Sequence, residues 1–436
     1  MSENAMPLIA GDPQAVARRR VIFAGAIGSA VEFYDFGVYG YLATTIAALF
    51  FPRSSASAAL LSTLAIFATA FLVRPLGSVL FGHIGDRYGR KPALSIAVIV
   101  MALATFCIGF LPTAPAIGVA APLLLLLARL IQGLSAGGEI GGAATMLAEA
   151  SRNHDRGLMT SACQTGSLVG LLAAAAVVAI LSAAIAPADM AAWGWRIPFI
   201  LALPTGLVGL YIRRRLTEAP AFTRLARAGS VARVPAIEAF RTAFVPMLKA
   251  FGVCVMDFVA YYLVYVYMTI YLQTQAGFSR PAATWSTTVT LLVSVVALPG
   301  FGWLSDRIGR RPVIAGAGIA LVLLTLPAFW LIHGGGPMLA AAAAQLVLGL
   351  CVAAIMGALW ATCAELFPTR VRYSGMGIAF SVAAALVGGT APYMATWLIA
   401  ATGNPTAPAW LLIAAALVTL LTLTTMRETA GRDMPG

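Results

Sequence analysis

The stretch FGHIGDRYGRK at residues 81–91 returns as FGWLSDRIGRR at residues 301–311. Each copy closes a long apolar run with Asp, Arg, Gly and a basic pair, and another apolar run follows at once. A turn with this many charges lies at a membrane surface, because one charge at the centre of a bilayer costs about 3 kcal/mol or more. The repeat therefore predicts a membrane protein built from two equivalent halves.

Both copies hold residue types that suit contact between helices. The glycine near the start of each copy lets a neighbouring helix approach closely, and the Asp one helical turn later lies on the same face. That carboxylate can cap the amino end of a neighbouring helix, and the arginines can pair with a carboxylate from an adjacent loop. We therefore predict a gate at this membrane surface. The predicted gating residues are Gly82, Asp86, Arg87, Arg90, Glu149, Gly302, Asp306, Arg307, Arg310 and Glu365.

A second pair of motifs supports the duplication. In MLAEASRNHDRG and TCAELFPTRVRYSG, Glu149 precedes Arg156 by the same interval as Glu365 precedes Arg372. The doubled GxxxDRxGR(K/R) pattern resembles the signature loop of the major facilitator superfamily. Parallel repeats of this kind are an expected transporter arrangement. The resemblance implies an all-α membrane protein with twelve transmembrane helices in two six-helix halves.

Composition agrees with a membrane protein. With 60% hydrophobic and 10% charged residues, and a mean hydropathy of +0.90, the chain has too little polar surface for a soluble protein of 436 residues. The net charge of +12 is not read as nucleic-acid binding, because no basic, aromatic-interleaved patch stands outside the apolar segments. Most of the 28 Lys and Arg residues lie in loops on one side, which the positive-inside rule makes cytoplasmic.

Twelve apolar segments are long enough to span a membrane. They cover about residues 21–50, 58–83, 93–111, 117–148, 158–185, 195–212, 247–273, 283–304, 312–332, 337–364, 376–400 and 408–426. We therefore divide the chain into a tail (1–20), a first half (21–212), a linker (213–246), a second half (247–426) and a tail (427–436), with one or two short helices expected in the linker near the lipid headgroups. Both tails are expected to be cytoplasmic, in the inner membrane of a cell.

Several functional classes are not supported by the sequence. The five cysteines lie inside apolar segments without a CxxC spacing, and the three histidines are far apart, so no metal or redox site is predicted. No HExxH or GxxxxGK motif is present. We expect neither an enzyme, a cofactor nor an ATP-driven pump, and no channel filter is visible.

The chemistry is expected at the few charges inside the spans. Glu32 and Asp35 share one helical face in VEFYDFGVYGY, and neighbouring carboxylates in a low-dielectric cavity can load and release a proton near neutral pH. Arg74 and Arg129 supply opposing charge, and Glu32 and Arg129 both fall near the middle of their spans, where they can pair. We predict that these four residues couple transport to protons. The alternative, a fixed ion-pair network that holds helices together, stays open.

Substrate contacts are predicted mainly in the second half. Asp257, Tyr261 and Tyr265 follow at intervals of one helical turn, and a carboxylate with tyrosine faces suits an ammonium group, since a cation–π contact is worth up to about 2 kcal/mol. The alternative is an aromatic stripe that packs against other helices. The predicted substrate-binding residues are Tyr34, Gln132, Glu139, Asp257, Tyr261, Tyr265 and Trp360.

A narrower resemblance rests on VEFYDFGVYGY, RLIQGLSAGGEIGG, WGWRIPFILALPTGLVGLYIRRRLTEAPAF and ELFPTRVRYSGMGIAF. Together they are similar to the metabolite/proton symporter family and, within it, to the proline/betaine osmolyte transporters. The resemblance implies uptake of a small zwitterion with protons, and we expect a monomer. Because the family also moves citrate, 2-oxoglutarate and shikimate, a carboxylate substrate remains an alternative. A membrane sensor is the other functional class, and proton-dependent uptake would separate it from a carrier.

Overall fold

The computed structural model describes residues 13–88, 90–137, 142–214, 235–369 and 371–435. The described residues are helical and include no strand, so the predicted all-α class is confirmed. The helices of the first half are α1 (Pro13–Tyr41), α2 (Ala43–Phe50), α3 (Ala56–Leu72), α4 (Arg74–Tyr88), α5 (Arg90–Ile108), α6 (Ala114–Ile117), α7 (Ala120–Ala136), α8 (Gly142–Ala150), α9 (Arg156–Ala184), α10 (Pro187–Asp189), η1 (Met190–Gly194), α11 (Arg196–Ile200) and α12 (Ala202–Arg214).

The second half repeats this pattern after the linker. After α14 (Pro235–Thr242) its helices are α15 (Phe244–Ala260), η2 (Tyr261–Tyr267), α16 (Met268–Thr274), α17 (Arg280–Ile308), α18 (Arg310–His333), α19 (Met338–Ala364), α20 (Arg372–Ala383), η3 (Ala384–Gly388), α21 (Ala391–Thr402) and α22 (Ala407–Thr424). Equivalent serines begin α3 and α17: Ser55 accepts from the Ala58 N–H and Ser279 from the Ala282 N–H. Helix α14 lies in the expected linker, while residues 215–234 are outside the described residues.

Apolar length agrees with the membrane assignment. Nine helical segments of the described chain are long and apolar enough to cross a bilayer, and Ser95–Ile108 and Ala120–Ala136 are shorter apolar helices. Large hydrophobic side chains such as Val79, Leu123 and Leu339 are exposed on the outside of the bundle, where lipid tails would cover them. The count of twelve spans and the domain boundaries remain predictions.

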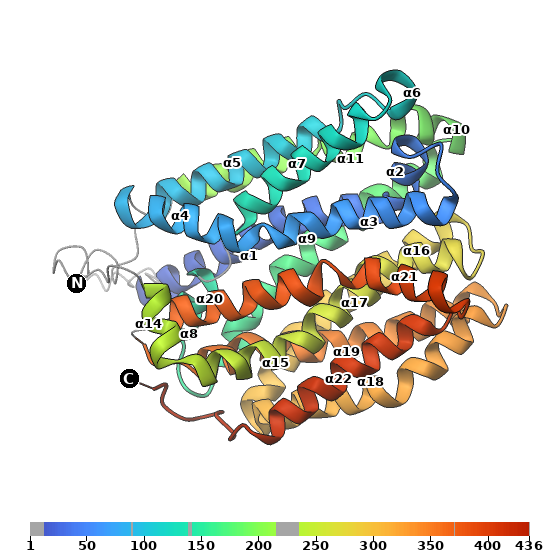
Figure 1. Ribbon diagram of the computed structural model, residues 1–436. Coiled ribbons are helices and arrows are strands. Elements are labelled where there is room, and N and C mark those ends of the chain that lie inside the picture. Colours follow the sequence, from blue (N-terminus) through green and yellow to red (C-terminus); the bar gives the residue numbers. More distant parts are fainter. Residues whose placement is uncertain (1–12, 89, 138–141, 215–234, 370, 436) are drawn as a thin grey trace, which may run out of the picture.

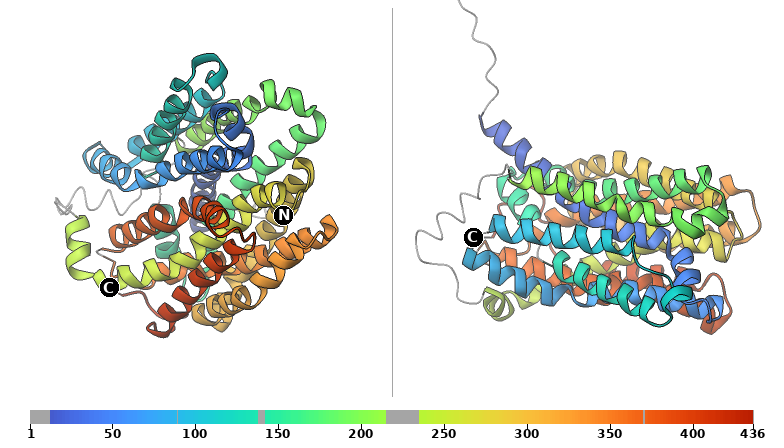
Figure 2. Two further views of the ribbon diagram at one scale, coloured as in Figure 1. Left: turned by 45° about the vertical axis from the view of Figure 1, so that its right-hand side comes forward. Right: turned by 90° about the horizontal axis from the view of Figure 1, so that it is seen from above.

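The helices run along one common axis, with the first half on one side and the second half on the other (Figures 1 and 2). One end of the bundle holds α8, α14, α20 and the C-terminal residues, and we call it the charged end. The opposite end holds α2, α6, α10 and α16. Helices α9 and α17 pack against each other where the two halves meet.

The contact of α9 with α17 depends on two glycines. A Cβ atom at Gly302 would lie 2.8 Å from the Gly157 carbonyl oxygen, and one at Gly157 would lie 2.5 Å from the Gly302 carbonyl oxygen. Only glycine at both positions lets the helices approach this closely. The close approach predicted at Gly302 is confirmed. The surroundings of Gly82, its counterpart, are outside the described part of the structure.

Candidate functional site

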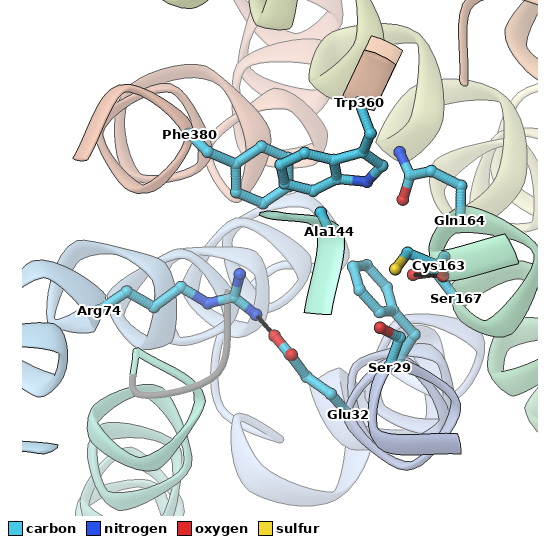
Figure 3. A pocket seen from close by; sticks show the side chains of 10 residues that line it. Ser29, Glu32, Arg74, Ala144, Cys163, Gln164, Ser167, Trp360 and Phe380 are labelled. Atoms are coloured by element: carbon cyan, nitrogen blue, oxygen red, sulfur yellow. Dashed lines mark hydrogen bonds and ion pairs between the residues drawn. The ribbon is translucent and has the colours of Figure 1, made fainter. Parts of the chain in front are cut away.

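A cavity lies between the two halves, with side chains from both around it (Figure 3). Its volume is about 40 Å³, which is space for water and too little for an organic substrate. Helices α1, α4, α8, α9, α19 and α20 contribute its lining residues. These are Ser29, Glu32, Phe33, Arg74, Ala144, Cys163, Gln164, Ser167, Trp360 and Phe380.

An ion pair forms part of the cavity wall. Nη2 of Arg74 donates to Oε1 of Glu32, and the two side chains are only 0% and 5% exposed. The Arg74 guanidinium also lies over the rings of Phe36 and Phe71, 4.8 and 4.7 Å from their centroids. A pair buried this deeply is costly to break from one side, because the remaining charge would lack compensation. Glu32 and Arg74 therefore form an electrostatic unit that faces the cavity.

The second arginine of the predicted proton-coupling group has different partners. Nη1 of Arg129 donates to Gln132 at 2.9 Å, and Nε2 of Gln132 donates to Thr105 at 2.5 Å. The Arg129 guanidinium also lies over the Tyr39 ring at 4.5 Å. The sequence suggested Arg129 as the partner of Glu32, whereas the structure gives that role to Arg74.

Glu32 and Asp35 differ in their surroundings although they share a helix. Glu32 lines the cavity, but Asp35 is 1% exposed and is not among the cavity-lining residues of the described chain. Charge from Arg129 acts on Asp35. Asp35 thus belongs with the Arg129 group, behind the cavity wall. Glu139 lies outside the described residues, so its predicted role has no structural counterpart here.

The predicted substrate-binding tyrosines pack away from the cavity. The Tyr34 hydroxyl donates to the Pro198 carbonyl at 2.8 Å, and the Tyr265 hydroxyl donates to the Gly349 carbonyl at 2.7 Å. Tyr261 stacks edge-on against Tyr265 and against Phe33, with ring centroids 5.6 and 5.4 Å apart. Tyr261 therefore packs against a ring that lines the cavity, and Tyr261 and Tyr265 make the contacts that the packing alternative expects.

Asp257 and Trp360 complete the predicted substrate set. Asp257 is 2% exposed, and it is not one of the cavity-lining residues found in the described chain. Trp360 does line the cavity, where its ring lies 4.5 Å from that of Phe380. Of the seven substrate-binding predictions, the structure brings Trp360 alone among the described residues to the cavity surface.

The charged end holds ion pairs that cross between the halves. Nη1 of Arg156 in the first half lies 2.7 Å from Oε1 of Glu365 in the second, and Nη1 of Arg372 in the second lies 2.9 Å from Oε1 of Glu149 in the first. Arg310 joins this network, with Nη2 3.2 Å from Glu365. The Glu and Arg residues of each motif therefore pair with the Arg and Glu residues of the other motif, across the two halves.

Asp306 has the capping role that its motif predicts. Its two carboxylate oxygens accept hydrogen bonds from the Gly157 and Leu158 N–H groups at 2.8 and 2.9 Å, at the amino end of α9. Arg310 pairs with Asp306 at 2.7 Å. Arg307 instead is exposed and lies over the Trp303 ring at 4.9 Å, so Arg310 is the arginine that links the carboxylates. The side chains of Asp86, Arg87 and Arg90 lie outside the described residues.

The C-terminal residues cover this network. Glu428 accepts hydrogen bonds from the N–H groups of Arg310 and Arg311 at 2.9 and 3.0 Å, and Thr429 donates to Glu365 at 2.5 Å. Partial burial opposes ionisation of Glu428, but four backbone N–H donors outweigh it and hold the pKa of Glu428 below its ordinary value. The C-terminal segment therefore binds the charged end as an ionic cap.

Sequence reasoning missed most of the cavity wall. Cys163, Gln164 and Ser167 come from α9, and Phe380 comes from α20. The available signal was the run SACQTGS, where small and polar residues at helical spacing interrupt an otherwise apolar span. Gln164, a polar side chain inside this apolar span, could have been proposed as a site residue from the sequence.

A helical bundle of two repeated halves, with a buried ion pair in a small cavity between them, is the arrangement expected of a membrane transporter. The family model described as Major Facilitator Superfamily matches residues 25–392 and again residues 250–433. The chain belongs to this superfamily. At the level of the family it is a transporter of small molecules and not an enzyme.

Curated relatives match nearly the whole chain. It is 38% identical over 427 residues to the proline/betaine transporter of Escherichia coli K12, covering 96% of this chain and 85% of the relative. It is 38% identical over 436 residues to the glycine betaine/proline/ectoine/pipecolic acid transporter OusA of Dickeya dadantii, with the same coverage. A putative proline/betaine transporter of Staphylococcus aureus is 36% identical over 422 residues, covering 96% of this chain and 90% of the relative. The resemblance to proline/betaine transporters is confirmed.

Solved structures agree on the fold. The partially occluded, inward-open xylose transporter XylE of E. coli matches with a TM-score of 0.76 at 18% identity, over 96% of this chain and 100% of that chain. The proton:xylose symporter XylE bound to 6-bromo-6-deoxy-D-glucose matches with a TM-score of 0.78 at 18% identity, over 97% and 98% of the two chains. These likenesses concern the arrangement of helices.

Proposed function

We propose that this chain is a proton-coupled symporter of the cell inner membrane that imports a small zwitterionic osmolyte, such as proline or glycine betaine. The observation that carries the proposal is the buried Glu32–Arg74 pair in the cavity between the halves. A carboxylate there can carry a proton, and an arginine there can bind a substrate carboxylate. The names of the curated relatives support the substrate class.

Alternating access is supported by the small volume of the cavity. A volume of about 40 Å³ cannot admit an osmolyte, so the halves must separate for binding. Separation at the charged end must break the Arg156–Glu365 and Arg372–Glu149 contacts. We assign the gating role to this network, with its end of the bundle on the cytoplasmic side.

A multivalent carboxylate such as citrate or 2-oxoglutarate is the second candidate. The unpartnered N–H groups of Arg74 among the described residues favour a carboxylate ligand. However, the cavity wall carries one cation and one anion in Arg74 and Glu32, so a net-neutral zwitterion leaves less uncompensated charge than a polyanion. This charge balance favours the osmolyte.

Uptake into proteoliposomes tests the proposal. An inward proton gradient should drive accumulation of labelled glycine betaine or proline, and a protonophore should abolish it. 2-Oxoglutarate, citrate and shikimate are the comparison substrates, and protein-free liposomes are the control. Uptake restricted to the carboxylates would refute the zwitterion assignment, and uptake indifferent to the protonophore would refute proton coupling.

A further inference from the structure

A second, larger cavity lies in the second half, between α17, α18 and α19, which pack against one another (Figure 1). Its volume is about 320 Å³, which is in the size range of ligand sites. Its lining residues come from 301–308, 312–317 and 350–354, and all of them are apolar or small. Ile308 among them is 54% exposed, so the cavity opens to the outside of the bundle. We call it the outer groove.

The outer groove begins at the charged end and runs into the part of the bundle that spans the membrane. Ile308 ends α17 and Pro312 lies in the first turn of α18, whereas Leu350 lies near the middle of α19. All three helices are long and apolar enough to cross a bilayer. Lipid headgroups therefore surround the mouth of the groove, and lipid tails surround its deeper part.

Two arginines stand at the mouth of the groove. Arg307 directly precedes Ile308, and Arg311 directly precedes Pro312. The Arg307 side chain is exposed, and its guanidinium lies 4.9 Å from the centre of the Trp303 ring. Nε of Arg311 is buried and has no hydrogen-bond partner in the described parts of the chain. The ion pairs of the described residues include neither arginine, so the mouth carries two positive charges that an anionic ligand can neutralise.

The backbone at the mouth is already satisfied. Glu428 accepts hydrogen bonds from the N–H groups of Arg310 and Arg311, which begin α18. The Arg310 guanidinium in turn pairs with Glu365. An anion at the mouth must therefore bind the side chains of Arg307 and Arg311. Guanidinium groups match the geometry of phosphate oxygens.

We propose that the outer groove binds one anionic phospholipid from the leaflet at the charged end. Its phosphate binds Arg307 and Arg311, and one of its acyl chains lies between α17, α18 and α19. Basic residues near a membrane surface attract anionic lipids, and the apolar lining favours an acyl chain. The outer groove shares no lining residue with the cavity between the halves, so the proposal does not depend on the transported substrate.

A second copy of this chain fits the groove less well. In a two-fold symmetric dimer both copies present the same surface, so a contact of groove with groove would bring Arg307 and Arg311 of each copy together. Like charges repel, and the repulsion is stronger where lipid excludes water. A phospholipid supplies the opposite charge and the apolar chain in one molecule.

Cys351 reports whether the groove is occupied. It lines the groove and is partly exposed, while three of the other four cysteines are buried. In a Cys107→Ser background, a membrane-permeant maleimide should therefore label Cys351 first. The protein is placed in phosphatidylcholine nanodiscs with or without phosphatidylglycerol of the same acyl chains. At about ten times its apparent Kd, phosphatidylglycerol should slow the labelling about tenfold.

Two further arms identify what protects Cys351. Glycerol phosphate, added to nanodiscs of phosphatidylcholine alone, carries the phosphate without acyl chains and should not protect. Protection by glycerol phosphate, or equal labelling with and without phosphatidylglycerol, would overturn the proposal. Protection that rises with protein concentration and not with lipid would assign the groove to a second copy of the chain, and would overturn it too.

Filling the groove tests the acyl-chain site. A Cβ atom at Gly316 meets nothing within 4 Å, so the side chain of Gly316→Leu enters the open space of the groove. Gly300→Leu is the matched control, because its Cβ atom is equally free and Gly300 is not one of the described residues that line the groove. Native mass spectrometry counts the phosphatidylglycerol molecules that stay bound. Gly316→Leu should lose one that Gly300→Leu keeps, and equal counts would contradict the site.

Removing one charge at a time tests the headgroup site. Arg307→Gln and Arg311→Gln should each weaken phosphatidylglycerol binding about fivefold and leave phosphatidylcholine binding unchanged. Arg241→Gln, an exposed arginine of α14 at the same end, is the control for lost positive charge and should bind as wild type does. Thermal unfolding identifies the variants that fold. Folded Arg307→Gln and Arg311→Gln proteins with wild-type affinity for phosphatidylglycerol would overturn the proposal.

Discussion

Arg156 and Glu365 form a buried ion pair across the two halves, with Nη1 and Oε1 2.7 Å apart and side chains 1% and 2% exposed. The reciprocal pair, Arg372 with Glu149, joins the equivalent residues of the two motifs, but the Glu149 side chain is 37% exposed. Breaking a buried pair leaves an uncompensated charge, whereas an exposed pair adds little. The two ion pairs between the halves therefore contribute unequally to the free energy of unfolding, although the motifs are equivalent.

The first prediction follows from this inequality. Glu365→Gln removes the carboxylate shared by Arg156 and Arg310 and should lower the free energy of unfolding by about 3–5 kcal/mol. Glu149→Gln, the matched variant, should cost less than about 1 kcal/mol, because the Glu149 side chain is 37% exposed and the buried Arg372 guanidinium keeps its carbonyl acceptors at Ala364, Phe367 and Pro435. Denaturant unfolding of both variants in detergent measures the difference. Equal losses would show that burial does not govern the two pairs.

The second prediction concerns closure of the halves. In Gly302→Ala, the new methyl group meets the Gly157 carbonyl at 2.8 Å, so α9 and α17 should be held apart at the charged end. Gly300→Ala is the matched control on the same helix, because a Cβ atom there meets nothing within 4 Å. Cys163, buried in the cavity wall, is a native reporter of access.

Labelling of Cys163 by a membrane-impermeant maleimide measures that access. The background carries Cys107→Ser and Cys351→Ser, since those two cysteines are less buried than the rest. Gly302→Ala should label faster than Gly300→Ala from the charged side. Identical rates in folded protein would mean that the glycine contact does not set closure.

The third prediction concerns pH at the charged end. The pKa of Glu428 is lowered in the folded state, so its contribution to stability is present above the ordinary glutamate pKa of about 4.3 and is lost as the pH falls through the lower folded value. Glu428→Gln should therefore lower the thermal midpoint at pH 7. The difference from wild type should shrink as the pH falls below about 4. A difference that is constant with pH would mean that the Glu428 charge is not what binds the segment.

Some of this structure could be predicted from the sequence because it is local. The doubled charged turn indicates the two halves, and the position of Asp306 one turn after Gly302 predicts that it can reach a neighbouring helix end, which proves to be that of α9. A repeated motif indicates which interactions its own residues can make. It does not indicate which helix supplies their partners.

Side-chain partners that lie on helices far apart in the sequence could not be predicted from sequence spacing. Glu32 meets Arg74 rather than Arg129 because the packing of α1 against its neighbours sets which side chains face each other. The π-helical turns at Tyr261–Tyr267 and Ala384–Gly388 also have no sequence signal of their own. They shift the register of a span, and π-helical turns occur often at functional sites. The directions of the side chains that follow these turns could therefore be determined only from the structure.

The last prediction separates the two buried arginines of the first half. Arg129 is held by Gln132 and by the Tyr39 ring, and it is not one of the described residues that line the cavity. Arg129→Gln should therefore lower the thermal midpoint and the yield, because Asp35 and the surrounding aromatic rings lose their central cation. Transport by the protein that does fold should continue, and counterflow of glycine betaine per folded molecule should stay near the wild-type level. Arg74→Gln should also lower the thermal midpoint, because it leaves Glu32 without its cation, but the protein that does fold should show little counterflow, since Arg74 lines the cavity. Size-exclusion chromatography, thermal unfolding and counterflow on the same preparations provide the comparison. A well-folded Arg129→Gln protein without coupled uptake would move the coupling role from the Glu32–Arg74 pair to Arg129 and Asp35.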